Sequence, residues 1–300
     1  YMKFTPRLLT LFILILLFSM KAKSQEEPAA YLVNSDFNLY HTTKDSTALI
    51  FSKIAYIRSQ PSSKSSLIDS LTLGTEVKFI EEEGLNPTSL RGMYLPWHKV
   101  EFNMNHEKKI GYIWIGLLSL DYTFDSSTGQ TYMYGFAWKS PEESNYYWVE
   151  AKVLDKNRKL IGNKGFAYYP GEQSYTSGEL LEPMGIEHAK NIYAINFMGE
   201  ACGIATENNL FSWDGTQFRN LPKLTGVSDA GVFYYVEELI FPKDHKLGND
   251  VILKTIEEGE AEEYDLDNPE DEIKFKVTKK QETFKFDGNA YKMIAEKKIK

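Results

Sequence analysis

The feature of this sequence that most limits its fold is the alternation of apolar and polar residues in short runs that end at turn-forming residues. Residues 146–154 alternate in this way and lead into the polar stretch 155–159, after which apolar residues resume at Leu160. A period of two predicts a β-strand, and a polar run between two such strands predicts a hairpin. Residues 191–197 predict another strand. Because helical periodicity is almost absent from the 300 residues, we expect an all-β protein.

Residues 1–24 have the composition of a secretory signal peptide. Two basic residues precede an apolar run from Leu8 to Phe18, and small residues follow at Ala22 and Ser24. This run is shorter than the roughly 20 residues that a helix needs to cross a hydrocarbon core. We therefore expect an exported protein, periplasmic or secreted, with no stable membrane anchor after signal cleavage. An uncleaved N-terminal anchor is the alternative.

The charge balance limits the class of partner. The chain has a formal net charge of −8, and residues 1–24 hold four basic residues and no acidic one, so cleavage would leave a net charge of −12. An acidic protein without basic clusters is a poor candidate for binding nucleic acid or anionic lipid. We expect no nucleic-acid partner. The length of the mature chain suggests two domains of ordinary size.

Cys202 is the only cysteine, so the chain can form no internal disulfide. It lies among small and apolar residues in the run 197–205, which predicts a buried, inert thiol. A catalytic cysteine would need a base within hydrogen-bond distance. The only later histidine is His245, in a polar, loop-like segment. The sequence therefore argues against a cysteine peptidase and favours a non-catalytic protein.

No motif for a metal or cofactor is evident. The five histidines are scattered, and neither a glycine-rich phosphate loop nor a Gly-x-Ser-x-Gly motif is present. Only the acidic run Asp265–Glu272 concentrates oxygen ligands. It lacks the glycine and the terminal glutamate spacing of the helix-loop-helix calcium loop. We interpret it as a solvated loop and leave calcium binding there open.

Residues 211–218 and 284–291 repeat one pattern, in which two aromatic residues precede Asp-Gly and a third follows it. Each copy predicts a hairpin closed on an Asp-Gly turn of type I′. The copies start 73 residues apart, which exceeds the roughly 40 to 50 residues of a propeller blade. We therefore expect residues 121–300 to form a larger antiparallel β domain, either a sandwich or an open meander. A partial β-propeller is the alternative.

The segment 54–118 carries an ordered series of turns and strands. An Arg-Ser-x-Pro turn begins at Arg58, a Gly-Thr turn lies at Gly74, and two strands contain Trp97-His98-Lys99-Val100 and Gly111-Tyr112-Ile113-Trp114. This order resembles a bacterial SH3-like (SH3b) domain over about residues 46–120. The resemblance implies a small barrel that binds rather than catalyses. Residues 25–45 would then be a linker or a lead-in strand, and residues 81–89 a long variable loop with a solvated tip.

Aromatic residues of this segment are the candidate binding residues. The resemblance implies bulky side chains in the barrel interior, and some aromatic rings could instead line a shallow groove; the candidates are Tyr94, Trp97, Tyr112 and Trp114. The favoured function is an exported binding protein whose SH3-like domain recognises cell-wall glycan, peptide or an envelope protein. One alternative is a hydrolase of envelope or dietary polymer with its site in residues 121–300. Another is a structural protein of envelope assembly.

Overall fold

The computed structural model describes residues 39–139, 146–169, 173–229, 231–262 and 274–299. Within these ranges the protein is all-β, as predicted, and its helical segments are two short 3-10 turns, η2 (Ile115–Leu117) and η3 (Pro242–Asp244). The expected signal peptide and the acidic run Asp265–Glu272 lie outside the described residues. In the part of the chain that is described, no helix is long and apolar enough to cross a membrane.

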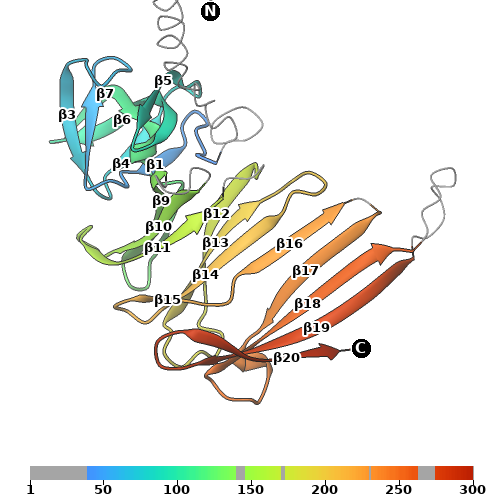
Figure 1. Ribbon diagram of the computed structural model, residues 1–300. Coiled ribbons are helices and arrows are strands. Elements are labelled where there is room, and N and C mark those ends of the chain that lie inside the picture. The colour runs from blue at the N-terminus through green and yellow to red at the C-terminus, as the bar shows by residue number, and fades with distance from the viewer. Residues whose placement is uncertain (1–38, 140–145, 170–172, 230, 263–273, 300) are drawn as a thin grey trace, which may run out of the picture.

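The N-terminal strands form one antiparallel sheet (Figure 1). They are β1 (Thr47–Leu49), β2 (Ile54–Arg58), β3 (Leu67–Thr72), β4 (Glu76–Phe79), β5 (Leu85–Leu90), β6 (Met93–Met104) and β7 (Glu107–Trp114). The strand order is β1-β4-β6-β7-β2-β3, and β5 also pairs with β6. Because the end strands β1 and β3 do not pair with each other, this sheet is open where a barrel was expected.

Two local expectations for this region need correction. Part of the stretch 81–89 was expected to be a solvated loop, yet Leu85–Leu90 forms strand β5 on β6. The stretch 25–45 was expected to be a linker or a strand. In its described part no strand is present, and Leu39 and Tyr40 are buried in the main core. The chain therefore joins the core before strand β1 begins.

A second sheet has four strands in the order β11-β10-β9-β8. They are β8 (Asp121–Asp125), β9 (Gln130–Lys139), β10 (Tyr147–Leu154) and β11 (Leu160–Tyr168). Their inward side chains pack against the third sheet in an aromatic core, where for example the rings of Tyr168 and Phe197 stack with centroids 3.8 Å apart. The four-stranded sheet thus forms one layer of a sandwich.

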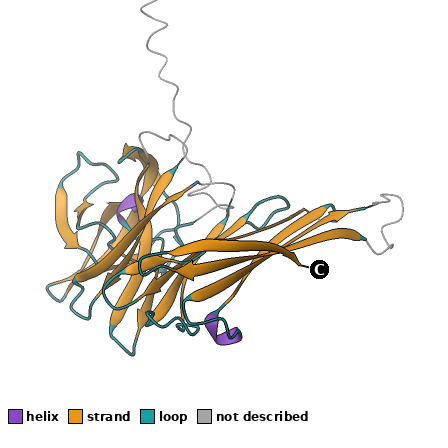
Figure 2. Ribbon diagram, turned by 60° about the horizontal axis from the view of Figure 1, so that its bottom comes forward, coloured by secondary structure: helices purple, strands orange, loops and turns teal. Residues whose placement is uncertain are grey.

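The third sheet has nine strands. They are β12 (Tyr175–Leu181), β13 (Asn191–Met198), β14 (Thr206–Trp213), β15 (Phe218–Asn220), β16 (Leu224–Asp229), β17 (Phe233–Ile240), β18 (Val251–Ala261), β19 (Phe275–Phe286) and β20 (Tyr291–Ile299). Their order is β12-β13-β14-β16-β17-β18-β19-β20, with β15 beside β14. Only the first strands cover the four-stranded sheet, and the rest fan out from the body as an open meander (Figure 1). In Figure 2 the long C-terminal strands extend away from the other sheets.

Side chains join the second sheet to the third where no backbone ladder does. Asp121 on β8 accepts a hydrogen bond from the backbone N–H of Gly178 on β12 at 2.9 Å. The hydroxyl of Thr123 donates to the carbonyl oxygen of the same Gly178 at 2.8 Å. Both backbone groups of one β12 residue are therefore satisfied by β8 side chains, which holds the two layers at a fixed distance.

The repeated aromatic pattern does form two hairpins. In the first, Trp213 pairs with Phe218, and in the second Phe286 pairs with Tyr291. The prediction of type I′ turns is wrong, because Gly215 and Gly288 have positive φ angles whereas the preceding aspartates do not. Each aspartate instead accepts hydrogen bonds from backbone N–H groups two and three residues later. The turn is therefore stabilised by a side chain.

Candidate functional site

The outer side of the four-stranded sheet carries a row of exposed aromatic residues. Along β10 the odd-numbered residues from Tyr147 to Val153 are buried, so Trp148 and its alternate neighbours point outward. Trp138 on β9 lies opposite Trp148, and Tyr146 and Tyr169 lie beside the adjoining pair Tyr147 and Tyr168. We call the group Tyr146, Trp138, Trp148 and Tyr169 the aromatic face.

The two tryptophans form a flat pair. Their ring centroids are 5.7 Å apart and their planes differ by 17°, so the indoles are stacked. Trp148 is half-buried, because it lies across Gly165 of β11, where an added Cβ would be 2.4 Å from the indole nitrogen. Trp138 is 41 % exposed. Because Gly165 has no side chain, the Trp148 indole can lie close against the sheet, whereas the Trp138 ring remains exposed to solvent.

The two tyrosines extend the row. Tyr146 and Tyr169 meet edge to face with centroids 5.6 Å apart, and both side chains are exposed. Contacts between aromatic side chains of neighbouring strands stabilise a sheet, and the exposed part of these rings leaves apolar surface that a ligand could cover. The row thus offers two kinds of ring surface, a flat stacked pair and an angled pair that carries hydroxyl groups.

A charged pair follows the tryptophans on the same side of β10. The Lys152 ammonium lies 3.2 Å from the Glu150 carboxylate, and both side chains are largely buried. Lys152 also donates to the carbonyl oxygen of Phe51 at 2.9 Å and lies 3.7 Å above the Phe51 ring. Burial lowers the pKa of Lys152, and the nearby Glu150 carboxylate partly opposes that shift. Glu150 is held by this ion pair and lies two residues from Trp148 on the same side of β10.

The side chains of this region offer surfaces for stacking and for hydrogen bonding. Aromatic rings accept the C–H faces of sugar rings or the side chains of a peptide, while a carboxylate and an ammonium offer hydrogen bonds to hydroxyl or amide groups. The aromatic face is open, and no cluster of histidine, cysteine, aspartate and glutamate capable of holding a metal ion occurs among the described residues.

The structure separates the four aromatic residues that the sequence singled out. Trp97 and Trp114 are opposite each other on β6 and β7 and are buried in the main core. The Trp97 indole donates to the hydroxyl of Thr88 at 3.0 Å, and the Trp114 indole donates to the carbonyl oxygen of Leu95 at 2.9 Å. Strand β5, which carries Thr88, covers them. They are structural residues in this fold.

The other two candidates are only partly buried, but they do not share a surface. Tyr112 pairs with Lys99 and therefore lies on the same side of the sheet as Trp97. Tyr94 is three residues from Trp97 on one continuous strand, so it points to the opposite side. The expected groove formed by all four rings is therefore not present.

The prediction for Cys202 is also wrong, because its side chain is exposed. Residues 199–205 form the connection between β13 and β14 and not a core strand. The small residues that suggested a packed interior instead border a hollow of about 420 Å³, together with residues of β16 and β17. No histidine is among the described residues that line this hollow.

A second polar contact, between Ser212 and His188, has a structural role. The Oγ of Ser212 lies 3.4 Å from Nε2 of His188, and the imidazole stacks on Phe286. Ser212 is fully buried, so its hydroxyl is not an accessible nucleophile. Arg219 approaches the same Phe286 ring, at 5.7 Å from its centroid. These contacts bring the two repeated hairpins together.

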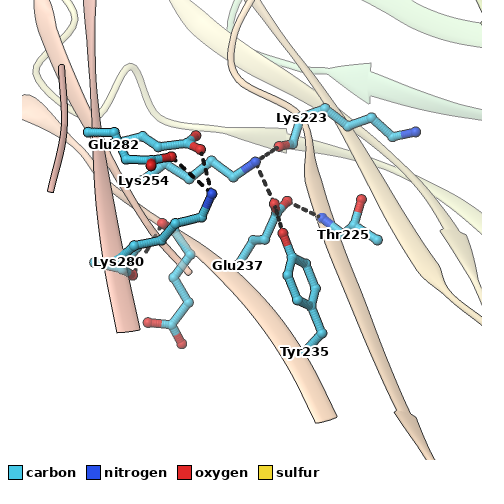
Figure 3. Close-up of polar contacts among 10 residues, drawn as sticks. Lys223, Thr225, Tyr235, Glu237, Lys254, Lys280 and Glu282 are labelled. Carbon is cyan, nitrogen blue, oxygen red and sulfur yellow. Dashed lines mark hydrogen bonds and ion pairs between the residues drawn. The ribbon is translucent and has the colours of Figure 1, made fainter. Parts of the chain in front are cut away.

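A buried ion pair lies where β16 separates from β17 (Figure 3). Glu237 binds the Lys254 ammonium at 2.7 Å and accepts hydrogen bonds from the Tyr235 hydroxyl at 2.6 Å and the Thr225 backbone N–H at 2.8 Å. Lys254 also donates to the carbonyl oxygen of Lys223 at 3.1 Å. Backbone pairing between β16 and β17 does not extend to Thr225. There, Glu237 on β17 binds both the Thr225 N–H on β16 and the Lys254 ammonium on β18, so the ion pair has a structural role.

A functional assignment for this protein has to rest on the geometry described above. No protein-family model matches the chain, and a search of curated proteins finds no relative. The sequence did contain a signal for the aromatic face. Alternation in residues 146–154 places Tyr146 and Trp148 on one side of a strand, but their neighbours Trp138 and Tyr169 follow only from the register of three strands.

Proposed function

We propose that this protein is an exported, non-catalytic binding protein that holds a cell-envelope glycan on the aromatic face. The stacked and partly exposed pair Trp138 and Trp148 is the observation that supports this proposal most directly. A pyranose ring presents C–H groups on its faces and hydroxyl groups at its rim. The exposed face of the stacked indole pair can pack against the face of a sugar ring, while Glu150 accepts a hydrogen bond from a hydroxyl group.

Two features of the sequence also support the proposal. They are the resemblance of residues 46–120 to a bacterial SH3-like domain and the expected signal peptide of residues 1–24. A bacterial SH3-like domain next to a glycan-binding surface would be consistent with a protein that works at the cell wall. Since Trp97 and Trp114 are buried, the proposal assigns the glycan contact to the four-stranded sheet and not to those residues. A peptide of the envelope remains the alternative ligand for the same rings.

Co-sedimentation with purified peptidoglycan sacculi tests the proposal. The mature chain, residues 25–300, is compared with a variant carrying Trp138→Ala and Trp148→Ala. We expect the double variant to bind at least about tenfold more weakly, because aromatic anchors supply much of the energy at such sites. Gly165→Val should weaken binding as well, since the added side chain displaces Trp148 while both indoles are retained.

The matched control is Tyr56→Ala, which removes an equally exposed aromatic ring from the N-terminal sheet. We expect this control to bind like the unmodified chain. If Tyr56→Ala lost binding and the double tryptophan variant still bound normally, wall recognition would lie in the N-terminal sheet, which would contradict the proposal. Release of soluble glycan fragments from the sacculi by the unmodified chain would support the hydrolase alternative instead.

A further inference from the structure

Strand β20 is an open edge of the nine-stranded sheet. It is the last strand in the sheet order and pairs only with β19 among the described residues (Figure 1). The opposite edge strand, β12, is different, because side chains of Asp121 and Thr123 bind its backbone. Along an open edge the outward N–H and C=O groups of the backbone are available to another strand. Strand β20 can therefore accept a partner strand by backbone pairing.

Between Lys292 and Lys298 the described residues cover neither face of β20. All residues from Lys292 to Lys298 are exposed, including Met293 at 55 % and Ile294 at 60 %. The register with β19 shifts here, because Phe284 lies opposite Met293 and Thr283 opposite Ala295, so Ile294 is the extra residue of a β-bulge and two neighbouring apolar side chains are exposed at the edge. An added strand would gain contacts with these apolar side chains in addition to its backbone hydrogen bonds.

The charge of this hairpin is opposite to that of the whole protein. Residues 275–299 contain seven lysines and three acidic residues, whereas the chain has a net charge of −8. Four of these lysines form ion pairs. Lys276, Lys297 and Lys298 make no ion pair with any described residue. Because Lys297 and Lys298 are adjacent on β20, each face of the edge carries one ammonium without a counter-charge.

These lysines also argue against pairing between two copies of this strand. In the antiparallel arrangement with the fullest overlap, centred on Ala295, Lys292 of one copy lies opposite Lys298 of the other. Like charges directly opposite each other destabilise a strand pair. Lysines on an edge strand are a known means of preventing self-association, and they favour a strand of opposite charge.

We propose that β20 binds an extended acidic segment of another protein by strand addition. The backbone of that segment would pair with the outer edge of β20, and its carboxylates would reach Lys297 on one face and Lys298 on the other. This inference rests on the C-terminal hairpin and is independent of the glycan proposal for the aromatic face. It gives the protein a second, protein-binding surface.

Fluorescence anisotropy with synthetic peptides tests this inference on the mature chain. The probe is a labelled peptide of nine residues, the length of β20, in which glutamate alternates with threonine or valine. We expect it to bind, and we expect the same peptide with lysine in place of glutamate not to bind. Two further peptides carry N-methyl groups on one or the other set of alternate backbone nitrogens. One of them should lose binding, because a single edge of the added strand faces β20.

A charge-reversed variant locates the site. Lys297→Glu with Lys298→Glu should weaken binding of the acidic peptide at least about tenfold. The matched control, Lys156→Glu with Lys159→Glu, makes the same change in net charge at the turn between β10 and β11 and should bind normally. Equal loss in both variants, or equal binding of both N-methylated peptides and the parent, would overturn strand addition. Tighter binding to anionic vesicles or single-stranded DNA than to the peptide would also overturn it.

Discussion

The buried His98 should make the stability of the N-terminal sheet depend on pH. It is fully buried on β6, and its imidazole makes an edge-to-face contact with the Phe79 ring at a centroid distance of 5.5 Å. Burial lowers the pKa of this imidazole from its usual 6.5 to about 4. Protonation therefore favours the unfolded chain in the range between these two values.

The size of the effect follows from the two pKa values. The folded pKa lies below the unfolded one, so the stabilising contribution is complete above about pH 6.5 and decreases as the pH falls toward 4. Between about pH 7.5 and about pH 4.5 the loss is roughly 2 to 3 kcal/mol of unfolding free energy, since one pKa unit corresponds to about 1.4 kcal/mol. Such a loss is a large fraction of the stability of an ordinary domain.

Urea unfolding followed by tryptophan fluorescence measures this dependence, because Trp97 and Trp114 lie in the same sheet. In the variant His98→Leu, the unfolding free energy should no longer show the decrease with falling pH that we attribute to the imidazole, whatever the stability of this variant at neutral pH. The control is His106→Asn, which replaces an exposed histidine and retains a residue that tolerates the positive φ of 67° at that turn. If the unmodified chain and His98→Leu lose stability in parallel over this range, the reasoning is refuted.

Two further predictions concern single side chains. Glu237→Ala should reduce the unfolding free energy by about 3 to 5 kcal/mol in urea titrations, because it leaves the buried Lys254 ammonium without its partner; adding Lys254→Met should recover much of that loss, and a cost below about 1 kcal/mol for the single variant would show that the pair is solvated. Cys202 should react with a maleimide in the native protein, as judged by intact mass, since its thiol is exposed; protection that lasts until denaturant is added would contradict this placement.

The sequence predicts the strands better than it predicts their neighbours. Alternation in residues 146–154 and 191–197 correctly locates strands β10 and β13, and the aromatic Asp-Gly pattern correctly locates two hairpins. These are local features, and local periodicity determines them. Which strands lie side by side depends on contacts between distant residues. The splitting of the chain into three sheets could not be obtained from the pattern alone.

The same distinction explains the outcome for the candidate site. An aromatic residue in a strand can face the core or solvent, and for Trp97 and Trp114 the answer depends on β5, which the sequence suggested was part of a loop. Conversely, Trp148 can lie close against the sheet because residue 165 on the neighbouring strand β11 is a glycine. Small residues misled the prediction for Cys202, because they also suit a tight connection between strands.

Residues from both sides of residue 120 share one hydrophobic core, so the protein cannot be divided there without exposing that core. The ring of Tyr40 contacts Phe136, with centroids 6.0 Å apart, and Phe51 packs with Met133. Cutting the chain between η2 and β8 would leave those aromatic surfaces in water on both fragments. The two pieces should then unfold or aggregate, so loss of an activity after truncation would report damage to the remaining piece, and point substitutions are the sound way to map function here.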